Sequence, residues 1–464
     1  MFTFNKLFPF APKRLQFYCE YANISKLKTR KQRKAAYGEL FPQNMLNKKH
    51  NVPTHMYLAN EETANLIDKQ LDPFFKQSPC DTILEINPGA CFLTNKLLNR
   101  EKQFKKIVLI ESTSHFVDPL QEMHYLYPDR VKFKLGDFVN IRKLVHLDKI
   151  DNGSRVSELL SDLPRKAYHD DANMILFGAI GCYQFFKHLL NSIMFGNSFL
   201  SLGRAEMYLI MPPPTYLHLT CSRDIGYLMY RATSIFFQIL FEYRFIERLP
   251  RVSFLPLQSE YFFNKRSKLK KILSVDADSL YLTRIVPRRN LHELCPPEDL
   301  PALWYFVTQN CISRRNRIIP NLEKWIPGCG ARLVVNNGKS EQPPQFYTDE
   351  QLSKLPKFSS PCKVLSTADA LPPINIYTEF GDLNPNQMLA LFRKFRAWPE
   401  YKDSSFLASL ENTMLRAVPT SDDINESLVE EEDITAETSS EIQEELNTKK
   451  KPKTKRTKKG KPST

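Results

Sequence analysis

A short apolar stretch, followed by a Pro-Gly turn and a helical pattern, constrains the fold of this chain more than any other feature. The stretch runs from Thr82 to Leu98 and reads TILEINPGACFLTNKLL. Its first residues are typical of a buried strand, and the apolar residues after the turn recur at helical spacing. A strand, a tight turn and a helix in this order open a doubly wound α/β sheet. A ligand placed beyond Glu85 would meet the helix N-terminus and the free N–H groups of the turn.

Two further expected strands end in acidic residues. Residues 106–111 (KIVLIE) form the second strand, which ends in Glu111, and residues 131–138 (VKFKLGDF) form the third, with Asp137 near its end. The carboxyl ends of parallel strands meet at one edge of a sheet, where open α/β sheets bind their ligands. An acid after the second strand suits a ribose diol, and an acid after the third suits an adenine amine.

These motifs resemble those of Rossmann-like methyltransferases that use S-adenosylmethionine, and in detail those of the ribosomal RNA adenine dimethyltransferase family. The first family motif, E-x-G-P-G-x-G-x-L-T, is similar to residues 85–94. A second family string, Q-N-F-L, stands before the first helix, and Tyr57 and Leu58 match its last two positions. His55 and Met56 replace its polar pair, and packing alone explains the match equally well. The resemblance implies that S-adenosylmethionine is held by Leu58, Glu85, Asn87, Gly89, Glu111 and Asp137.

The catalytic motif of the family is missing at the exit of the fourth expected strand. Family members carry Asn-(Leu/Ile)-Pro-(Tyr/Phe) there, so that an amide oxygen and a backbone carbonyl accept hydrogen bonds from adenine N6 while the ring stacks on the flipped base. The matching positions here are Gly178, Ala179, Ile180 and Gly181. Loss of one positioned polar group commonly costs a factor of about 10² to 10³ in rate. We therefore assign no catalytic residue and expect methylation to be weak or lost.

The turn that would hold the cofactor also departs from the family pattern. Asn87 and Cys91 stand where the family has glycines, and a Cβ atom at either position crowds the approach to the backbone. Asparagine tolerates a positive φ better than most residues, so Cys91 is the more serious change. Because Glu111 and Asp137 remain, we expect weak or vestigial binding of S-adenosylmethionine.

The later strands complete a Rossmann-like methyltransferase sheet of seven strands over residues 51–290. The fourth to seventh strands are expected at residues 173–177, 205–211, 258–264 and 279–286. Residues 140–171 are polar and predict a loop, and residues 226–241 predict a long helix. A small helical domain is expected over 291–416, with a flexible insert at 336–373 and a last structured helix at 384–398.

Both ends of the chain differ from the body in charge. Residues 1–53 carry 11 Lys/Arg against two acids, and the first 19 residues have the acid-free composition of a mitochondrial presequence. A disordered basic N-terminus is the alternative. Residues 417–464 place 11 acids before nine bases, and such blocks stay unfolded. We expect a presequence and basic arm over residues 1–50, a disordered tail over 417–464, and a location in the mitochondrial matrix, at the nucleoid.

The charge of the body favours a polyanionic partner. The formal net charge of the chain is +14, of which about +7 belongs to the part between the two ends. A merely solvated basic surface is the alternative. No apolar run reaches about 18 residues, so no membrane partner is expected. The nine cysteines form no C-x-x-C pair or Cys/His cluster, which predicts reduced thiols and no metal site.

Two groups of arginines are candidates for nucleic-acid contacts. The string CISRRNR at residues 311–317 is similar to a family string of the type F-x-x-R-R-K-x-L-R. Its members Arg314, Arg315 and Arg317 are candidates because guanidinium forks suit phosphate oxygens, with solvated arginines on a helix face as the alternative. Arg284, Arg288 and Arg289, in and after the seventh strand, complete the expected groove.

A basic member of the family with a presequence and a lost catalytic motif resembles one mitochondrial branch of it. The resemblance implies that the protein joins the mitochondrial RNA polymerase and helps to melt promoter DNA. A groove built to hold an extruded base can trap one melted strand and lower the cost of the open bubble. Two alternatives stay open. One is an active enzyme that dimethylates adenines of the mitochondrial small-subunit ribosomal RNA, and the other is a ribosome-assembly binder with neither activity.

Overall fold

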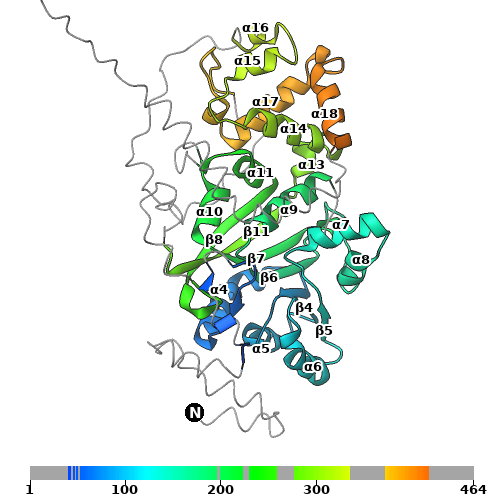
Figure 1. The fold of residues 1–464 in the computed structure, drawn as a ribbon, viewed down its shortest axis with the longest axis vertical. Coiled ribbons are helices and arrows are strands. Elements are labelled where there is room, and N and C mark those ends of the chain that lie inside the picture. Colours follow the sequence, from blue (N-terminus) through cyan, green and yellow to red (C-terminus); the bar gives the residue numbers. More distant parts are fainter. Residues whose placement is uncertain are drawn as a thin grey trace, which may run out of the picture.

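A seven-stranded sheet forms the centre of the molecule, with helices on both faces (Figure 1). The computed structural model describes residues 40–42, 45–46, 49–50, 53–195, 199–222, 229–258, 276–334 and 371–416. In spatial order the strands are β5 (Val131–Leu135), β4 (Lys106–Glu111), β3 (Thr82–Ile86), β6 (Met174–Ala179), β7 (Ala205–Met211), β11 (Ser279–Pro287) and β8 (Phe241–Pro250). The first five are parallel, whereas β11 is antiparallel to both of its neighbours. The predicted Rossmann-like sheet of seven strands is therefore confirmed.

The central strands are covered on both faces, which explains why they read as nearly continuous apolar runs. Their side chains alternate between two hydrophobic layers, so that Leu84 and Val108 enter one layer and Ile83 and Leu109 the other. The layer of Ile83 is covered by α4 (Glu61–Phe75), α5 (Phe92–Leu98) and α6 (Val117–Leu126). The layer of Leu84 is covered by α7 (Ile141–Asp151), α8 (Arg155–Leu160), α9 (Tyr183–Phe195), α10 (Pro213–Thr220) and α11 (Ala232–Leu240).

The C-terminal helices gather at one end of the molecule, at the top of Figure 1. They are α14 (Leu300–Asn310), α15 (Ile318–Glu323), α16 (Cys329–Val334), α17 (Pro385–Arg396) and α18 (Ser405–Arg416). Aromatic rings hold them together, with Phe306 and Phe395 at 5.3 Å and Trp325 and Phe406 at 4.9 Å between ring centroids. The helix predicted over residues 384–398 is present as α17, but it is not the last one, because α18 follows it.

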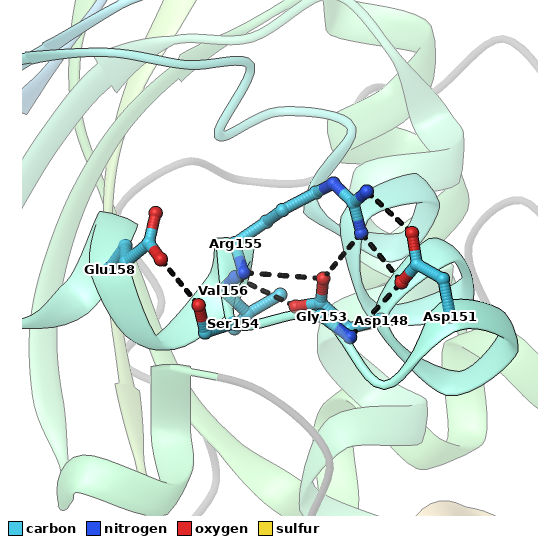
Figure 2. Close-up of polar contacts among 7 residues, drawn as sticks. All are labelled: Asp148, Asp151, Gly153, Ser154, Arg155, Val156 and Glu158. Carbon is cyan, nitrogen blue, oxygen red and sulfur yellow. Dashed lines mark hydrogen bonds and ion pairs between the residues drawn. The ribbon is translucent and has the colours of Figure 1, made fainter.

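The segment predicted as a loop over residues 140–171 contains two helices, so that prediction was wrong. In α7 Ile141 is the one residue whose side chain is buried, and α8 buries Leu159 and Leu160. Arg155 joins them, since its guanidinium lies 3.0 Å from an oxygen of Asp148 and 2.8 Å from one of Asp151 (Figure 2). The backbone N–H of Val156 also donates to Asp148 at 2.9 Å. Polar contacts thus fix the junction between the two helices, while apolar side chains of both pack on the sheet.

The position of one predicted strand was also wrong. The strand β8 lies at one edge of the sheet, whereas the sequence placed a strand at residues 258–264. Several side chains of β8 are charged and exposed, namely those of Glu242, Arg244 and Arg248. Charges of this kind protect an edge strand from pairing with other chains, and they hide the apolar alternation that identifies a strand. Residues 259–264 lie outside the described part of the chain.

Other predictions fall mostly or wholly outside the described residues. These are the presequence and basic arm, most of the insert at 336–373 and the tail after residue 416. Of the helix predicted at 226–241, residues 226–228 also lie outside the described chain, and the observed helix is α11, from Ala232 to Leu240. In the ranges that are described, no helix has both the length and the apolar composition to cross a bilayer. The same ranges contain no group of three or more His, Cys, Asp or Glu side chains arranged to hold a metal ion.

Candidate functional site

Residues 53–58, which we call the strap, cross the carboxyl edge of the parallel strands. The backbone of His55 forms an antiparallel bridge with Ile180, just beyond β6, and the N–H of Gly181 donates to the carbonyl of Thr54 at 3.3 Å. The strap ends in β2 (Tyr57–Leu58), which pairs antiparallel with β9 (Phe254–Leu255). The chain therefore lays its own backbone over the edge where a ligand of this sheet would bind.

Glu111, at the end of β4, is fully buried and is held by hydrogen bonds from its own chain. Its Oε1 accepts from the Tyr57 hydroxyl at 3.1 Å and from the Thr113 N–H at 2.9 Å. Its Oε2 accepts from the Gly89 N–H at 3.1 Å. Burial raises the pKa of Glu111 above its ordinary value, although these hydrogen bonds oppose the rise. Both oxygens of the carboxylate predicted for a ribose diol are thus already engaged.

Asp137, after β5, is engaged in the same way by the other end of the strap. Its Oδ1 lies 2.9 Å from Nε2 of His55 and accepts from the Asn140 N–H at 3.1 Å. Its Oδ2 accepts from the Asn140 side-chain amide at 2.8 Å. Burial alone would raise the pKa of Asp137, but the hydrogen bond and charge of His55, together with Asn140, lower it to about 2. The acid predicted for the adenine amine is therefore satisfied within the chain.

The turn after β3 keeps the backbone shape of a glycine-rich turn. Asn87, Gly89 and Cys91 all have positive φ, at 52°, 57° and 59°. The Tyr57 ring lies on this turn, because a Cβ atom on Gly89 would be 2.9 Å from Cδ1 of Tyr57. Among the predicted cofactor residues of the described chain, Asn87 is the one with a buried polar side chain that lacks a hydrogen-bond partner. Asn87 and Cys91 thus adopt the backbone conformation of the glycines that they replace, and this conformation is strained for residues with a side chain.

The remaining predicted cofactor residues are also buried. Glu85 is buried near the end of β3, and its Oε2 accepts from the Thr94 hydroxyl at 2.7 Å. Burial raises the pKa of Glu85 to about 7, which the Thr94 hydrogen bond opposes and the nearby Glu111 reinforces. Leu58 is 9% exposed and packs in β2. Glu85, Glu111 and the turn of Asn87 and Gly89 are hence close together, as predicted.

The arrangement does not fit S-adenosylmethionine as it stands. A ribose diol needs a carboxylate oxygen with a free acceptor position, and the fully buried Glu111 offers no exposed surface. Asp137 retains partial exposure, but His55 and Asn140 already use its two oxygens. A cofactor would have to displace the Tyr57 hydroxyl to reach Glu111, and at Asp137 it would meet His55 on Oδ1 and Asn140 on Oδ2. The strap therefore competes with the ligand for which the edge of the sheet is suited.

The exit of β6 is closed by the strap as well. Gly178 and Ala179 end β6, and Ile180 and Gly181 follow as buried residues. A Cβ atom on Gly181 would lie 1.8 Å from the carbonyl oxygen of Pro53, so that a side chain at this position collides with backbone. Tyr183 is buried at the start of α9, 4.7 Å between centroids from His218, and does not supply the missing ring.

Replacing Gly181 with alanine is expected to displace the strap and to lower the free energy of unfolding by about 1–3 kcal/mol, as overpacking does. The new methyl group must push the Pro53 carbonyl away, which breaks the pairing between the strap and Ile180. Gly178→Ala is the matched control, because its Cβ would meet only the Ile86 side chain, at 3.1 Å. Limited proteolysis near residue 55 should accelerate in the first variant only. Equal cleavage of both variants would contradict the role given to Gly181.

The predicted arginines differ in how far they can reach a partner. Arg288 and Arg314 are only 3% and 6% exposed, so burial removes these two from the candidate contacts. Arg284 forms an ion pair with Glu206 at 3.2 Å, and Arg289 pairs with Asp171 at 3.4 Å. Within the group at residues 314–317, the exposed members are Arg315 and Arg317. The sequence thus identified two exposed cations in the helical region but did not separate them from the buried arginines.

The sequence did not reveal the roles of His55 and of the Tyr57 hydroxyl. In the sequence, Tyr57 matches a position of the family string Q-N-F-L and His55 departs from it, and neither observation indicates a hydrogen bond to an acid. Their partners are 54 and 82 positions away along the chain, for Tyr57 with Glu111 and His55 with Asp137. The hydroxyl of Tyr57 is the one sequence feature that could have indicated such a contact, since a buried tyrosine normally forms a hydrogen bond.

Comparison with known proteins places these features in a family. The family model "Ribosomal RNA adenine dimethylase" matches residues 46–334. The Drosophila melanogaster protein "Dimethyladenosine transferase 2, mitochondrial" is 56% identical over 397 residues, which cover 86% of this chain and 88% of that protein. The Rattus norvegicus protein of the same name is 25% identical, over 58% of this chain and 67% of that protein.

Among solved structures, the 23S rRNA methyltransferase ErmE aligns with 73% of this chain and 99% of its own. Its identity is 13% and its TM-score is 0.37, values too low to add to the argument. The family model and the Drosophila relative carry the assignment by themselves, since each covers more than half of the chain. This chain belongs to the ribosomal RNA adenine dimethylase family.

Proposed function

We propose that this protein is a mitochondrial transcription initiation factor, which assists the mitochondrial RNA polymerase in melting promoter DNA. The observation that carries the proposal is the strap, which engages Glu111 and Asp137 and fills the exit of β6. Methyl transfer needs both a bound cofactor and a bound target base, and in this proposal the strap occupies the positions of both. The similarity to relatives named as mitochondrial supports the location, which we place in the matrix at the nucleoid.

Methyl transfer requires a bound methyl donor and an adenine N6 amine held in line with it. S-adenosylmethionine would supply the methyl group, and Glu85, Glu111, Asp137 and the turn of residues 87–91 would be its contacts. Here the Tyr57 hydroxyl and the His55 imidazole take the place of ribose and adenine at the two acids. Gly178 to Gly181 offer the target base neither an amide nor a ring. Binding of the cofactor is consequently weak or vestigial.

A melting factor needs only to hold one strand once it is open, which a basic surface with exposed aromatic groups can do. Arg315 and Arg317 are exposed in the helical region and suit the phosphates of such a strand. Arg289 is also exposed, although Asp171 partly neutralises it. The presequence and the polymerase-binding surface belong to this proposal as expectations from the family resemblance.

Run-off transcription with purified mitochondrial RNA polymerase tests the proposal. On duplex promoter DNA, the full chain should raise the transcript yield by about tenfold or more. Each base-pair step costs about 1.4 kcal/mol to open, so stabilising one open step already corresponds to about a tenfold change. On a template whose start site is already melted, the yield should be nearly independent of the protein. Equal stimulation of both templates would contradict a role in melting.

The alternative is an active dimethyltransferase that acts on adenines of the mitochondrial small-subunit ribosomal RNA. The retention of Glu85, Glu111 and Asp137 at one edge favours it, as does membership of the family. A radiolabelled methyl-donor assay on the RNA hairpin separates the two functions. Methylation of the hairpin without any effect on duplex transcription would establish the alternative, and binding to the small subunit without either activity would favour an assembly factor.

A further inference from the structure

Three basic side chains on α7 and α9 each bury a nitrogen atom that has no hydrogen-bond partner within the described chain. The atoms are Nε of Arg142, Nε2 of His146 and Nε2 of His188. Buried polar atoms in proteins are nearly always hydrogen-bonded, so that each exception calls for an explanation. We call these three residues the basic cluster.

The fold brings the members of the basic cluster to one side of the sheet. Arg142 and His146 are four positions apart in α7, which places them on the same face of that helix. The helix α9, which carries His188, packs on the same hydrophobic layer as α7. Burial lowers the pKa of His188 to about 4, and the charge of Arg142 contributes to this shift. His188 and Arg142 are therefore close enough to interact.

Arg142 differs from the other arginines whose Nε atom is buried without a partner. In Arg130, Arg284 and Arg288, a terminal nitrogen of the guanidinium forms a hydrogen bond or an ion pair. Arg314 also interacts with other residues of the chain. Arg142, in contrast, forms no hydrogen bond and no ion pair with any residue that the structure describes. A guanidinium stays charged in proteins, and a partly buried charge without a counter-charge is costly.

The two acids of α7 are engaged elsewhere. Asp148 and Asp151 lie 3.0 and 2.8 Å from a guanidinium nitrogen of Arg155 (Figure 2). Asp148 also accepts from the N–H of Val156 at 2.9 Å. The helix thus carries acids that are paired and an arginine that is not, and the residues described by the structure supply no counter-charge for Arg142.

We propose that the basic cluster binds one phosphate-type oxyanion. The Arg142 guanidinium supplies the charge and a planar pair of N–H donors, which matches two oxygens of a phosphate group. A histidine that carries its proton on Nε2 donates to a further oxygen, so a bound oxyanion selects this tautomer in His146 and His188. A cation would be repelled by Arg142, and an apolar ligand would leave the buried nitrogens unpaired. The site goes beyond the proposed function, because the phosphate group can belong to a small molecule or to a nucleic-acid strand.

Equilibrium dialysis of the full chain against radiolabelled inorganic phosphate, at constant ionic strength in chloride, tests the site. Arg142→Gln should weaken binding by about tenfold or more, the effect of losing one hydrogen bond between charged groups. His188→Phe, which keeps a ring and removes its nitrogens, should also weaken binding. Lys143→Gln is the matched control, because Lys143 is the next residue of α7, carries the same charge and is exposed. Its affinity should stay close to that of the wild type.

Urea unfolding shows whether Arg142→Gln folds and what its charge does. Without phosphate, this variant should be at least as stable as the wild type, because it removes a partly buried charge that has no counter-charge. Replacing chloride with phosphate should stabilise the wild type and Lys143→Gln more than Arg142→Gln, since a bound ligand stabilises the folded state. Comparison of the three proteins cancels the general stabilising effect of phosphate salts.

Absence of phosphate binding in the wild type would overturn the site. An equal loss of affinity in Arg142→Gln and Lys143→Gln would overturn it as well, because a merely basic surface gives that result. An unlabelled single-stranded DNA oligonucleotide distinguishes the two sources of the phosphate group. Displacement of the labelled phosphate would support a strand as the occupant, and retention would support a free phosphate or a small phosphate ester. These measurements do not involve transcription, so failure of the melting function would leave the site standing.

Discussion

Replacing Tyr57 with phenylalanine is expected to raise the affinity of the protein for S-adenosylmethionine by about tenfold or more. The change removes the hydroxyl that donates to Glu111 at 3.1 Å and keeps the ring that packs on the turn. A hydrogen bond to a charged group contributes about 1.5–3 kcal/mol, and a ribose hydroxyl can take over the acceptor position once it is vacant. Equilibrium dialysis or calorimetry with the radiolabelled or unlabelled cofactor measures the effect.

Tyr208→Phe is the matched control for this prediction. It also removes a buried hydrogen bond between a tyrosine and a glutamate, from Tyr208 to Glu206 at 3.0 Å, but in β7 and outside the predicted cofactor residues. The control should leave cofactor affinity unchanged, and adding His55→Gln to Tyr57→Phe should raise the affinity further. If Tyr57→Phe binds the cofactor no better than the wild type, the hydroxyl is not what closes the site.

Gain of cofactor binding is not expected to restore methylation. Gly178 to Gly181 would still offer no amide and no ring to the adenine, and the Pro53 carbonyl would still occupy the space beside Gly181. In the proposed function the two losses are separate, since the strap would block the donor and the β6 exit would lack the groups that orient the acceptor. A variant that binds S-adenosylmethionine and remains inactive is the expected result of repairing only the first.

The part of the site that could be predicted from the sequence is the part made of consecutive residues. The strand, turn and helix of residues 82–98 appear as predicted, because the apolar period and the Pro-Gly turn are local signals. Glu111 was placed correctly for a similar reason, since it ends a short apolar strand. What those acids contact was not predictable, because the strap reaches them across 54 and 82 residues.

The errors in the fold have a common physical cause. In α7 a single side chain, that of Ile141, is buried, which leaves a weak apolar stripe for a helix prediction, and contacts of Arg155 with two aspartates link α7 to α8 (Figure 2). In β8, charged side chains replace the alternation expected of a strand, because this strand lies at the edge of the sheet. The structure at these positions depends on polar contacts between residues, which the periodicity of apolar residues in the sequence does not reveal.

Replacing Glu85 with glutamine is expected to stabilise the protein above neutral pH by about 3 kcal/mol. Burial raises the pKa of Glu85 from its ordinary value of 4.5 to about 7, so the folded state holds this proton more tightly than the unfolded state. The stability that this confers is fully present below pH 4.5 and is lost as the pH rises through 7. A shift of this size corresponds to about 3 kcal/mol, and glutamine, which does not titrate, avoids the loss.

Urea unfolding of wild type and Glu85→Gln between pH 5 and pH 8.5 measures this effect as a difference. The comparison cancels other titrating groups, including the buried His188 and His218, whose pKa values burial lowers to about 4. Stability of the wild type relative to the variant should fall between pH 5 and about pH 7 and level off above that. Glu101→Gln serves as the control, because its carboxylate is 73% exposed and its replacement removes no buried charge. A flat difference for Glu85→Gln would mean that the carboxylate is already charged at pH 5, and that Thr94, which donates to it at 2.7 Å, offsets its burial.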